Sequence, residues 1–203
     1  MVRVVKKPEE RRKDIITLAT KLFWENDYEK TSMNQIVSEL GIAKGTVYHY
    51  FKSKEELMFA VIDDEVVNYI KMMKRALKKA PVDAVDRFIY LLRKGVVADR
   101  SKSEHLHKSG NNVLHTRLLA KLISELALIY ADVIKDGCDQ GVFKCQRPLE
   151  TAEFLLSPAF IVDVGVYPWS EETLKRRQSA FPAIIETQLG TKKGAFKALS
   201  FRG

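Results

Sequence analysis

The sequence predicts an all-α protein, with an N-terminal three-helix domain joined to a larger helical domain. Apolar residues recur at three- and four-residue spacing through most of the 203-residue chain, which is the helical period. Gly and Pro separate these stretches, and few segments alternate with the period of two typical of strands. The chain is 46% hydrophobic, enough to build a folded core.

The first helix is expected over residues 9–25. Its apolar positions fall on one helical face: Ile15, Leu18, Ala19, Leu22 and Phe23. Asn26 and Asp27 follow, and both residue types tolerate the left-handed backbone of a tight exit. The sequence therefore predicts a turn directly after residue 25.

The next two helices form a helix-turn-helix over about residues 32–51. Ser32 and Gln35 have the spacing of a capping box, which predicts a helix start. Gly41 ends that helix, and a third is expected over residues 44–51, with Val47 and Phe51 facing the core.

A long helix is expected to start at Ser53, where Glu56 completes a second capping-box pattern, and to reach about Lys79. Pro158 and Pro182 fall inside later predicted helices and are expected to kink them. Those further helices are predicted over 82–98, 102–109, 112–136, 149–166 and 171–189. The resulting domains are 1–52, 53–190 and a basic C-terminal tail, 191–203.

Charge favours a polyanionic partner. The net charge is +8, and both ends of the chain are rich in Lys and Arg. The ends are either solvated termini or arms that touch nucleic acid, and the sequence leaves both readings open.

Composition also predicts a soluble, cytoplasmic protein that needs no cofactor and contacts no membrane. The two cysteines, Cys138 and Cys145, match no common zinc spacing and suit a reducing compartment. No signal peptide opens the chain, and its longest uncharged stretch is too short to span a bilayer. His105, His107 and His115 invite a metal site, but their spacing favours a polar surface or hinge segment.

The third helix has the side chains of a DNA-reading element, because it offers cations, hydroxyls and aromatic rings on one exposed side. Lys52 and Lys54 follow it, where they can reach phosphates. The alternative is an ordinary helical hairpin whose aromatic residues fill a core. Tyr48, His49 and Tyr50 are consecutive, however, and cannot all be buried.

Residues 31–57 resemble the DNA-binding domain of the tetracycline-repressor (TetR) family. Their sequence is TSMNQIVSELGIAKGTVYHYFKSKEEL. The close match covers about residues 11–62. Asp27 stands where that family usually has glycine and Val37 where it has alanine, and the first change requires a left-handed Asp. The resemblance implies a DNA-binding N-terminal domain with these contact residues: Thr31, Ser32, Lys44, Gly45, Thr46, Tyr48, His49, Tyr50, Lys52 and Lys54.

The same resemblance implies that the larger domain binds a ligand and forms a homodimer through the helices near 149–166 and 171–189. Such a dimer reads a pseudo-palindromic operator, and a small-molecule effector releases it. For each candidate pocket residue, ordinary core packing remains the alternative. The candidates are Tyr69, Met73, Phe88, Tyr90, Asn111, Asn112, His115, Tyr130 and Phe160.

A transcriptional repressor is therefore the leading hypothesis, because repression requires only occupancy of a promoter. An activator of the same fold is the alternative. A helical enzyme or ligand carrier is less favoured, because the chain has no nucleophile elbow, phosphate loop or zinc-protease motif. A membrane-surface or RNA-binding module would need a strongly basic amphipathic helix or an aromatic stacking sheet. The sequence predicts no catalytic residues and no metal site.

Overall fold

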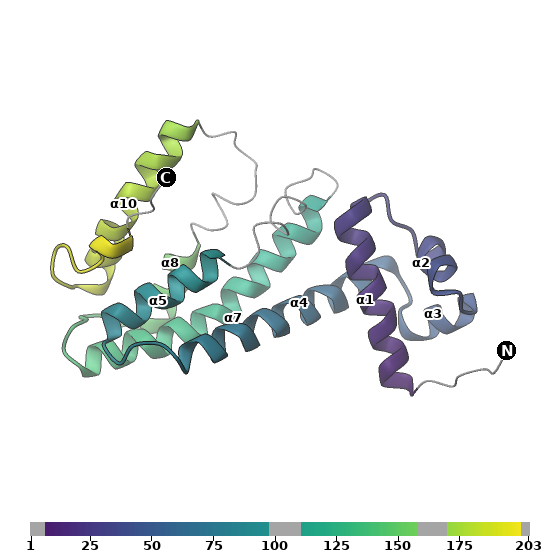
Figure 1. Cartoon of the computed structure of the whole chain (residues 1–203), viewed down its shortest axis with the longest axis horizontal. Coiled ribbons are helices and arrows are strands. Elements are labelled where there is room, and N and C mark those ends of the chain that lie inside the picture. Colours follow the sequence, from purple (N-terminus) through teal and green to yellow (C-terminus); the bar gives the residue numbers. More distant parts are fainter. Residues whose placement is uncertain (1–6, 98–110, 158–169, 200–203) are drawn as a thin grey trace. The chain divides into compact units, whose positions relative to one another are not determined.

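The structure, a computed structural model, describes residues 7–97, 111–157 and 170–199 (Figure 1). These residues form helices and their connecting turns, with no strand among them, which confirms the predicted all-α class. They divide into two compact units. The first contains residues up to Val67 and a later segment ending at Leu118, and the second contains the rest.

Three helices open the first unit: α1 (Pro8–Asn26), α2 (Met33–Leu40) and α3 (Lys44–Tyr50). Four of the five predicted core positions of α1 are buried, as are Ile16 and Trp24, whereas Leu18 is half-buried. Val47 of α3 and Phe51 after it are also buried, as predicted. The apolar spacing thus packs the three helices around one core.

The predicted ends of α2 are present. Ser32 Oγ accepts a hydrogen bond from the Gln35 N–H at 3.1 Å. The Gln35 side chain donates to Glu39 Oε1 instead of returning to the cap, so only the Ser half of the predicted capping box forms. Gly41 ends the helix in the left-handed region, with φ 62° and ψ 30°.

Helix α4 (Lys54–Leu77) starts at the second predicted cap. Ser53 Oγ accepts from the Glu56 N–H at 3.0 Å, and Glu56 Oε2 accepts from the Lys52 N–H at 2.7 Å. The residues of α4 up to Val67 belong to the first unit and the remainder to the second.

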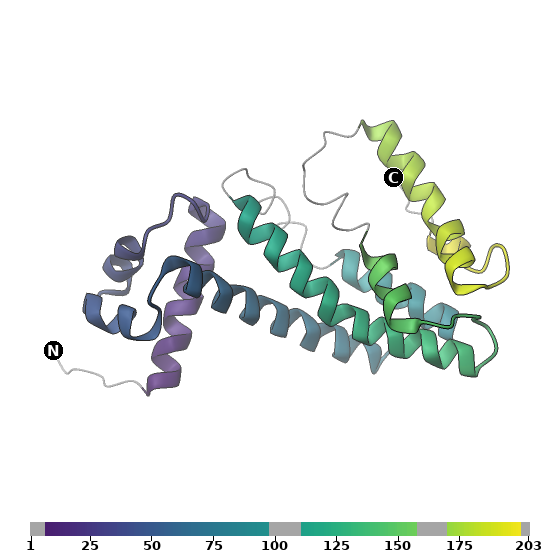
Figure 2. The ribbon, with the colours of Figure 1, turned by 180° about the vertical axis from the view of Figure 1, so that it is seen from behind.

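The second unit is built from the end of α4 with α5 (Ala84–Val97), α7 (Asn112–Asp139), α8 (Pro148–Leu156), α10 (Glu171–Leu189) and the 3-10 turn η2 (Lys197–Leu199). The later part of α4 runs alongside α5 and α7 in both views (Figures 1 and 2). Phe88 of α5 and Tyr130 of α7 meet edge to face at 5.1 Å between ring centroids, inside the shared apolar core.

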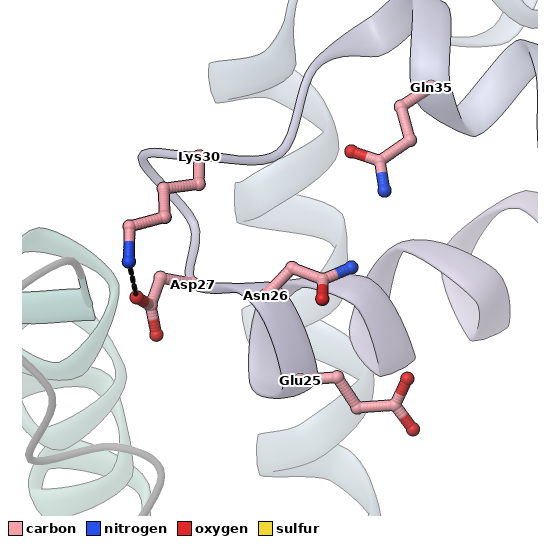
Figure 3. A pocket seen from close by; sticks show the side chains of 5 residues that line it. All are labelled: Glu25, Asn26, Asp27, Lys30 and Gln35. Atoms are coloured by element: carbon pink, nitrogen blue, oxygen red, sulfur yellow. Dashed lines mark hydrogen bonds and ion pairs between the residues drawn. The ribbon is translucent and has the colours of Figure 1, made fainter.

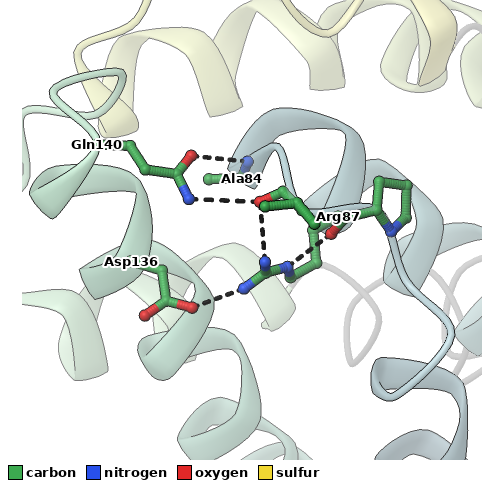
Figure 4. A network of polar contacts seen from close by, with 6 residues as sticks. Ala84, Arg87, Asp136 and Gln140 are labelled. Atoms are coloured by element: carbon green, nitrogen blue, oxygen red, sulfur yellow. Dashed lines mark hydrogen bonds and ion pairs between the residues drawn. The ribbon is translucent and has the colours of Figure 1, made fainter.

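A polar network fixes the α4–α5 connection to the end of α7 (Figure 4). The Arg87 guanidinium donates to the Pro81 and Val82 carbonyls, each at 2.8 Å, and to Asp136 Oδ2 at 2.6 Å. Gln140 Oε1 accepts from the first N–H of α5, that of Ala84. The network gives partners to the first N–H of α5 and to two carbonyls of the connection before it.

Residues 191–199 are not the separate tail that the sequence suggests. Phe196 is fully buried between Phe88 and Phe143, and Leu199 is buried in the same core. The buried Glu186 carboxylate accepts the Phe196 N–H at 3.0 Å. This segment therefore folds back onto the second unit.

The other predicted helices agree with the structure where it describes them. Helix α10 continues through Pro182, and α7 extends the prediction by three residues to Asp139. The 102–109 helix, Pro158 and the predicted extension of α8 lie outside the described residues. No described helix has the length and apolar character needed to cross a bilayer.

Candidate nucleic-acid interface

Helix α3 buries one side and exposes the other. Val47 is completely buried, whereas Lys44, Gly45 and His49 are exposed. The remaining nominated residues of this helix are half-buried: Thr46, Tyr48 and Tyr50. The three consecutive aromatic residues therefore do not fill a core, which removes the simple helical-hairpin alternative.

Aromatic rings lie beside the basic side chains of this surface. Lys44 Nζ lies 5.5 Å from the centroid of the Tyr48 ring, and His49 meets Tyr50 edge to face at 5.3 Å. Arg12 of α1 lies 5.1 Å from the Phe51 ring centroid, just beyond α3. In the sequence, Arg12 is only one of several basic residues near the N-terminus. Its position beside α3 could not be predicted, because it depends on how α1 packs.

The two lysines after α3 differ in their surroundings. Lys52 is exposed. Lys54 Nζ donates to the carbonyls of Tyr28 at 3.0 Å and Glu29 at 3.3 Å, and it lies 4.3 Å from the Tyr28 ring centroid. The ammonium of Lys54 therefore holds the α1–α2 turn.

Thr31 is buried rather than exposed to a partner. Its hydroxyl donates to the Asp27 carbonyl at 2.9 Å and the Leu22 carbonyl at 3.3 Å. This corrects the assignment of the Thr31 side chain to a phosphate contact, because its proton points into the turn. Ser32 next to it is exposed and caps α2.

Gly45 lies in the first turn of α3 in open space. A Cβ built on it would meet no atom within 4 Å. The fold itself therefore does not require glycine here, and the missing side chain leaves the backbone open to a close approach from outside.

Asp27 has the positive φ that its position requires, 70°, but its ψ of 146° lies outside the left-handed helical region that the sequence predicts. L residues rarely adopt this conformation. Asp27 lines a polar depression with Glu25, Asn26, Lys30 and Gln35, where its Oδ2 pairs with Lys30 Nζ at 3.0 Å (Figure 3).

Asn111, directly before α7, contacts the α1–α2 turn, and the start of α7 contacts the start of α4, all within the first unit. Asn111 is buried, and its Oδ1 accepts the Tyr28 N–H at 2.7 Å. Arg117 pairs with Glu55 at 3.1 Å and covers the exposed Phe59 ring at 4.7 Å. Burial, and then the Glu55 charge, raise the pKa of the Tyr28 hydroxyl.

The structure separates the nine candidate pocket residues. Five lie in or against the core of the second unit: Tyr69, Met73, Phe88, Tyr90 and Tyr130. Asn111, Asn112 and His115 belong to the first unit, and Phe160 lies outside the described residues. His115 is buried, which corrects the polar-surface half of its prediction and leaves the hinge segment as a prediction.

Two of these five residues, Tyr69 and Tyr130, are tyrosines whose pKa is raised. Tyr69 donates to the Gly95 carbonyl at 3.0 Å, and burial raises its pKa to about 12. Burial also raises the pKa of Tyr130, with the nearby Tyr69 adding to the effect. Within the described residues there is no cluster of three or more potential metal ligands.

Two sequence profiles match the chain. Residues 15–61 match bacterial regulatory proteins of the tetR family, and residues 94–184 match the tetracyclin repressor-like C-terminal domain. An HTH-type transcriptional regulator of Staphylococcus aureus (strain bovine RF122 / ET3-1) is 34% identical over 139 residues, 64% of this chain and 70% of that protein. The uncharacterized HTH-type transcriptional regulator YfiR of Bacillus subtilis (strain 168) is 27% identical over 156 residues, 73% of this chain and 76% of YfiR.

Solved structures share the fold at lower sequence identity. RolR in complex with resorcinol superposes with a TM-score of 0.67 at 18% identity, covering 97% of this chain and 95% of RolR. The transcriptional repressor QsdR of R. erythropolis superposes with a TM-score of 0.58 at 17% identity, covering 91% of this chain and 97% of QsdR. These similarities support the arrangement of helices.

Proposed function

This chain belongs to the tetR family of bacterial regulatory proteins and is a transcriptional regulator, and from that premise we propose that it is a ligand-released, dimeric repressor. The observation that carries the proposal is α3, which buries Val47, exposes Lys44 and His49, and keeps its hydroxyl-bearing side chains partly accessible. Repression follows from occupancy alone, and QsdR of the same fold is named a repressor.

In this proposal α3 lies in the major groove. Lys44, Gly45, Thr46 and Tyr50 approach the bases, where ammonium and hydroxyl groups distinguish base edges. The other contacts go to the phosphate backbone, which fixes the register of the helix. They come from Ser32, Tyr48, His49, Lys52 and Arg12, with Lys54 acting chiefly on the α1–α2 turn.

We propose that α8 and α10 form the dimer interface. Both helices carry large apolar side chains exposed to solvent: Leu149, Phe154 and Ile184, with Phe154 63% exposed. Leu155, Ile185 and Leu189 are buried in the core of the second unit, so they stabilise the protomer. A two-fold dimer presents two α3 helices to a pseudo-palindromic operator.

Release by a small molecule requires that the ligand bind the non-DNA-binding arrangement more tightly, and DNA then weakens ligand binding by the same factor. Helices α4 and α7 each contribute residues to both units. In this proposal, these two continuous helices couple ligand binding in the second unit to DNA binding in the first. RolR is described with resorcinol, which supports an uncharged aromatic effector beside the neutral Tyr69 and Tyr130 phenols.

Selection from a random duplex library at low ionic strength tests DNA binding directly. We expect enrichment of a sequence with two-fold symmetry and one dimer per site by light scattering. Enrichment of no sequence, or binding as a monomer to a single half-site, would contradict the proposal.

A reporter driven by a promoter that contains the selected sequence distinguishes repression from activation. Deleting the regulator should raise reporter expression, because an unoccupied operator no longer blocks transcription. A fall in expression would favour the activator.

A further inference from the structure

The turn between α7 and α8 brings the two cysteines of the chain together. The Gly137 carbonyl accepts the N–H groups of Val142 at 2.9 Å and Phe143 at 3.0 Å, which reverses the chain. Gly137 is required here because a Cβ on it would lie 2.1 Å from the Phe143 ring. The chain reversal returns Cys145 to the helix that carries Cys138.

The contacts between the two residues are direct. Cys138 Sγ donates to the Cys145 carbonyl oxygen at 3.5 Å, and that oxygen is two bonds from the Cα that bears the second thiol. Cys145 Sγ donates to Thr151 Oγ1 at 3.2 Å, in the first turn of α8. Both cysteines are free and partly exposed, so a small oxidant can reach them.

We propose that Cys138 and Cys145 form a dithiol site that a peroxide oxidises to an intramolecular disulfide. A disulfide requires the two Cα atoms to lie within about 7 Å. The 3.5 Å contact between the Cys138 sulfur and the Cys145 carbonyl oxygen makes these two residues direct neighbours. The site is separate from the DNA-reading surface, and nothing in it depends on the proposed function.

The chemistry balances with hydrogen peroxide as the oxidant. One thiolate attacks the O–O bond, forms a sulfenic acid and releases hydroxide, which takes up the thiol proton as water. The second thiol attacks the sulfenic sulfur, the S–S bond forms, and a second water leaves. Two thiols and one peroxide thus give one disulfide and two waters.

Closing the bond changes the start of α8. In a disulfide, Cys145 Sγ no longer carries a hydrogen, so it can no longer donate to Thr151 Oγ1 near the start of α8. Thr151→Val removes the same contact without touching either cysteine. This variant is expected to lose its thiols to peroxide faster than the wild-type chain, because its Cys145 is no longer held.

The test treats the reduced full-length protein with hydrogen peroxide, then counts free thiols in denaturant and measures intact mass without reductant. We expect both thiols to disappear together, the mass of one chain to fall by two hydrogens, and dithiothreitol to restore both. A peptide map should link Cys138 to Cys145 within one chain.

Cys138→Ser and Cys145→Ser are the matched controls, with circular dichroism to verify folding. Each should lose the two-hydrogen mass change and instead trap a sulfenic acid with dimedone. Three results with the wild-type chain would overturn the proposal: persistence of both thiols, a disulfide between chains, or dimedone trapping of both cysteines within one chain. If a serine variant fails to fold, the peptide map and Thr151→Val still decide it.

Discussion

The backbone N–H of Tyr28 donates a 2.7 Å hydrogen bond to Oδ1 of Asn111, 83 residues further along the chain. Tyr28 stands in the turn after α1, and Asn111 directly precedes α7. The tetracyclin repressor-like profile covers 94–184, yet the segment from Asn111 to Leu118 packs in the unit that contains α1–α3. The bond therefore fixes the DNA-binding helices to a segment outside the DNA-binding profile.

Asn111→Ala should destabilise the protein by about 1–3 kcal/mol, because it leaves the Tyr28 N–H without its acceptor in a partly buried position. Urea unfolding, followed by circular dichroism, measures the change in the free energy of unfolding. Asn112→Ala is the matched control, since Asn112 is exposed. Equal stability of the two variants would show that the bond contributes nothing.

Helix positions could be predicted because period and caps are local properties. Ser32, Gly41 and Ser53 delimit α2 and α4 through contacts within four residues, and their types reveal them in the sequence. Pairs such as Tyr28 with Asn111 could not be predicted, because neither residue type specifies a partner 83 positions away.

The candidate site was likewise predictable where it depends on local sequence and not where it depends on packing. The exposed face of α3 follows from its short sequence, whereas burial of Thr31 and the engagement of Lys54 depend on the α1–α2 turn. Asp27 shows the same limit: its positive φ followed from its place after α1, but its ψ is set by how the turn packs.

Lys52→Ala should lower the slope of log affinity against log salt by about one unit, because one phosphate contact is lost and its counterion is no longer released. Fluorescence anisotropy with the selected operator at several salt concentrations measures the slope. Thermal stability should stay unchanged, since Lys52 is exposed.

Lys54→Ala is the contrasting variant. It should lower the melting temperature, because the Tyr28 and Glu29 carbonyls lose their donor, and change the salt slope less than Lys52→Ala does. A larger change in salt slope for Lys54→Ala than for Lys52→Ala would assign the main phosphate contact to Lys54.

Gly45→Ala should separate folding from DNA binding. Alanine is favoured over glycine in a helix by up to about 1 kcal/mol, and its methyl group meets no atom of the protein within 4 Å. We expect an unchanged or higher melting temperature together with weaker operator binding, because the methyl group occupies the space through which DNA approaches. Wild-type affinity in the more stable variant would mean that DNA does not come close to Gly45.

Asp27→Gly should stabilise the protein by about 1 kcal/mol. The backbone conformation of Asp27 costs an L residue about 1–3 kcal/mol, and glycine removes that cost. Part of the gain is offset, because the variant loses the ion pair with Lys30 and because glycine gives the unfolded chain more backbone freedom. Asp27→Ala removes the carboxylate but keeps the strain, so it should be less stable than Asp27→Gly in thermal unfolding. If the two variants have the same melting temperature, the stabilisation comes from removing the carboxylate and not from relieving backbone strain.

Glu186→Ala should loosen the segment of residues 191–199 and lower the free energy of unfolding by about 1–3 kcal/mol. The buried Glu186 carboxylate is the acceptor for the Phe196 N–H, and without it that donor is left unsatisfied against the Phe88 and Phe143 rings. Hydrogen exchange read by mass spectrometry should show faster exchange at 192–199 and little change in α1–α3. Glu186→Gln keeps an amide oxygen at the same position, so it should protect the Phe196 amide nearly as well as the wild type. If both variants exchange faster than the wild type to the same extent, the negative charge of the carboxylate is what holds the segment. If neither variant exchanges faster than the wild type, apolar packing of Phe196 and Leu199 suffices.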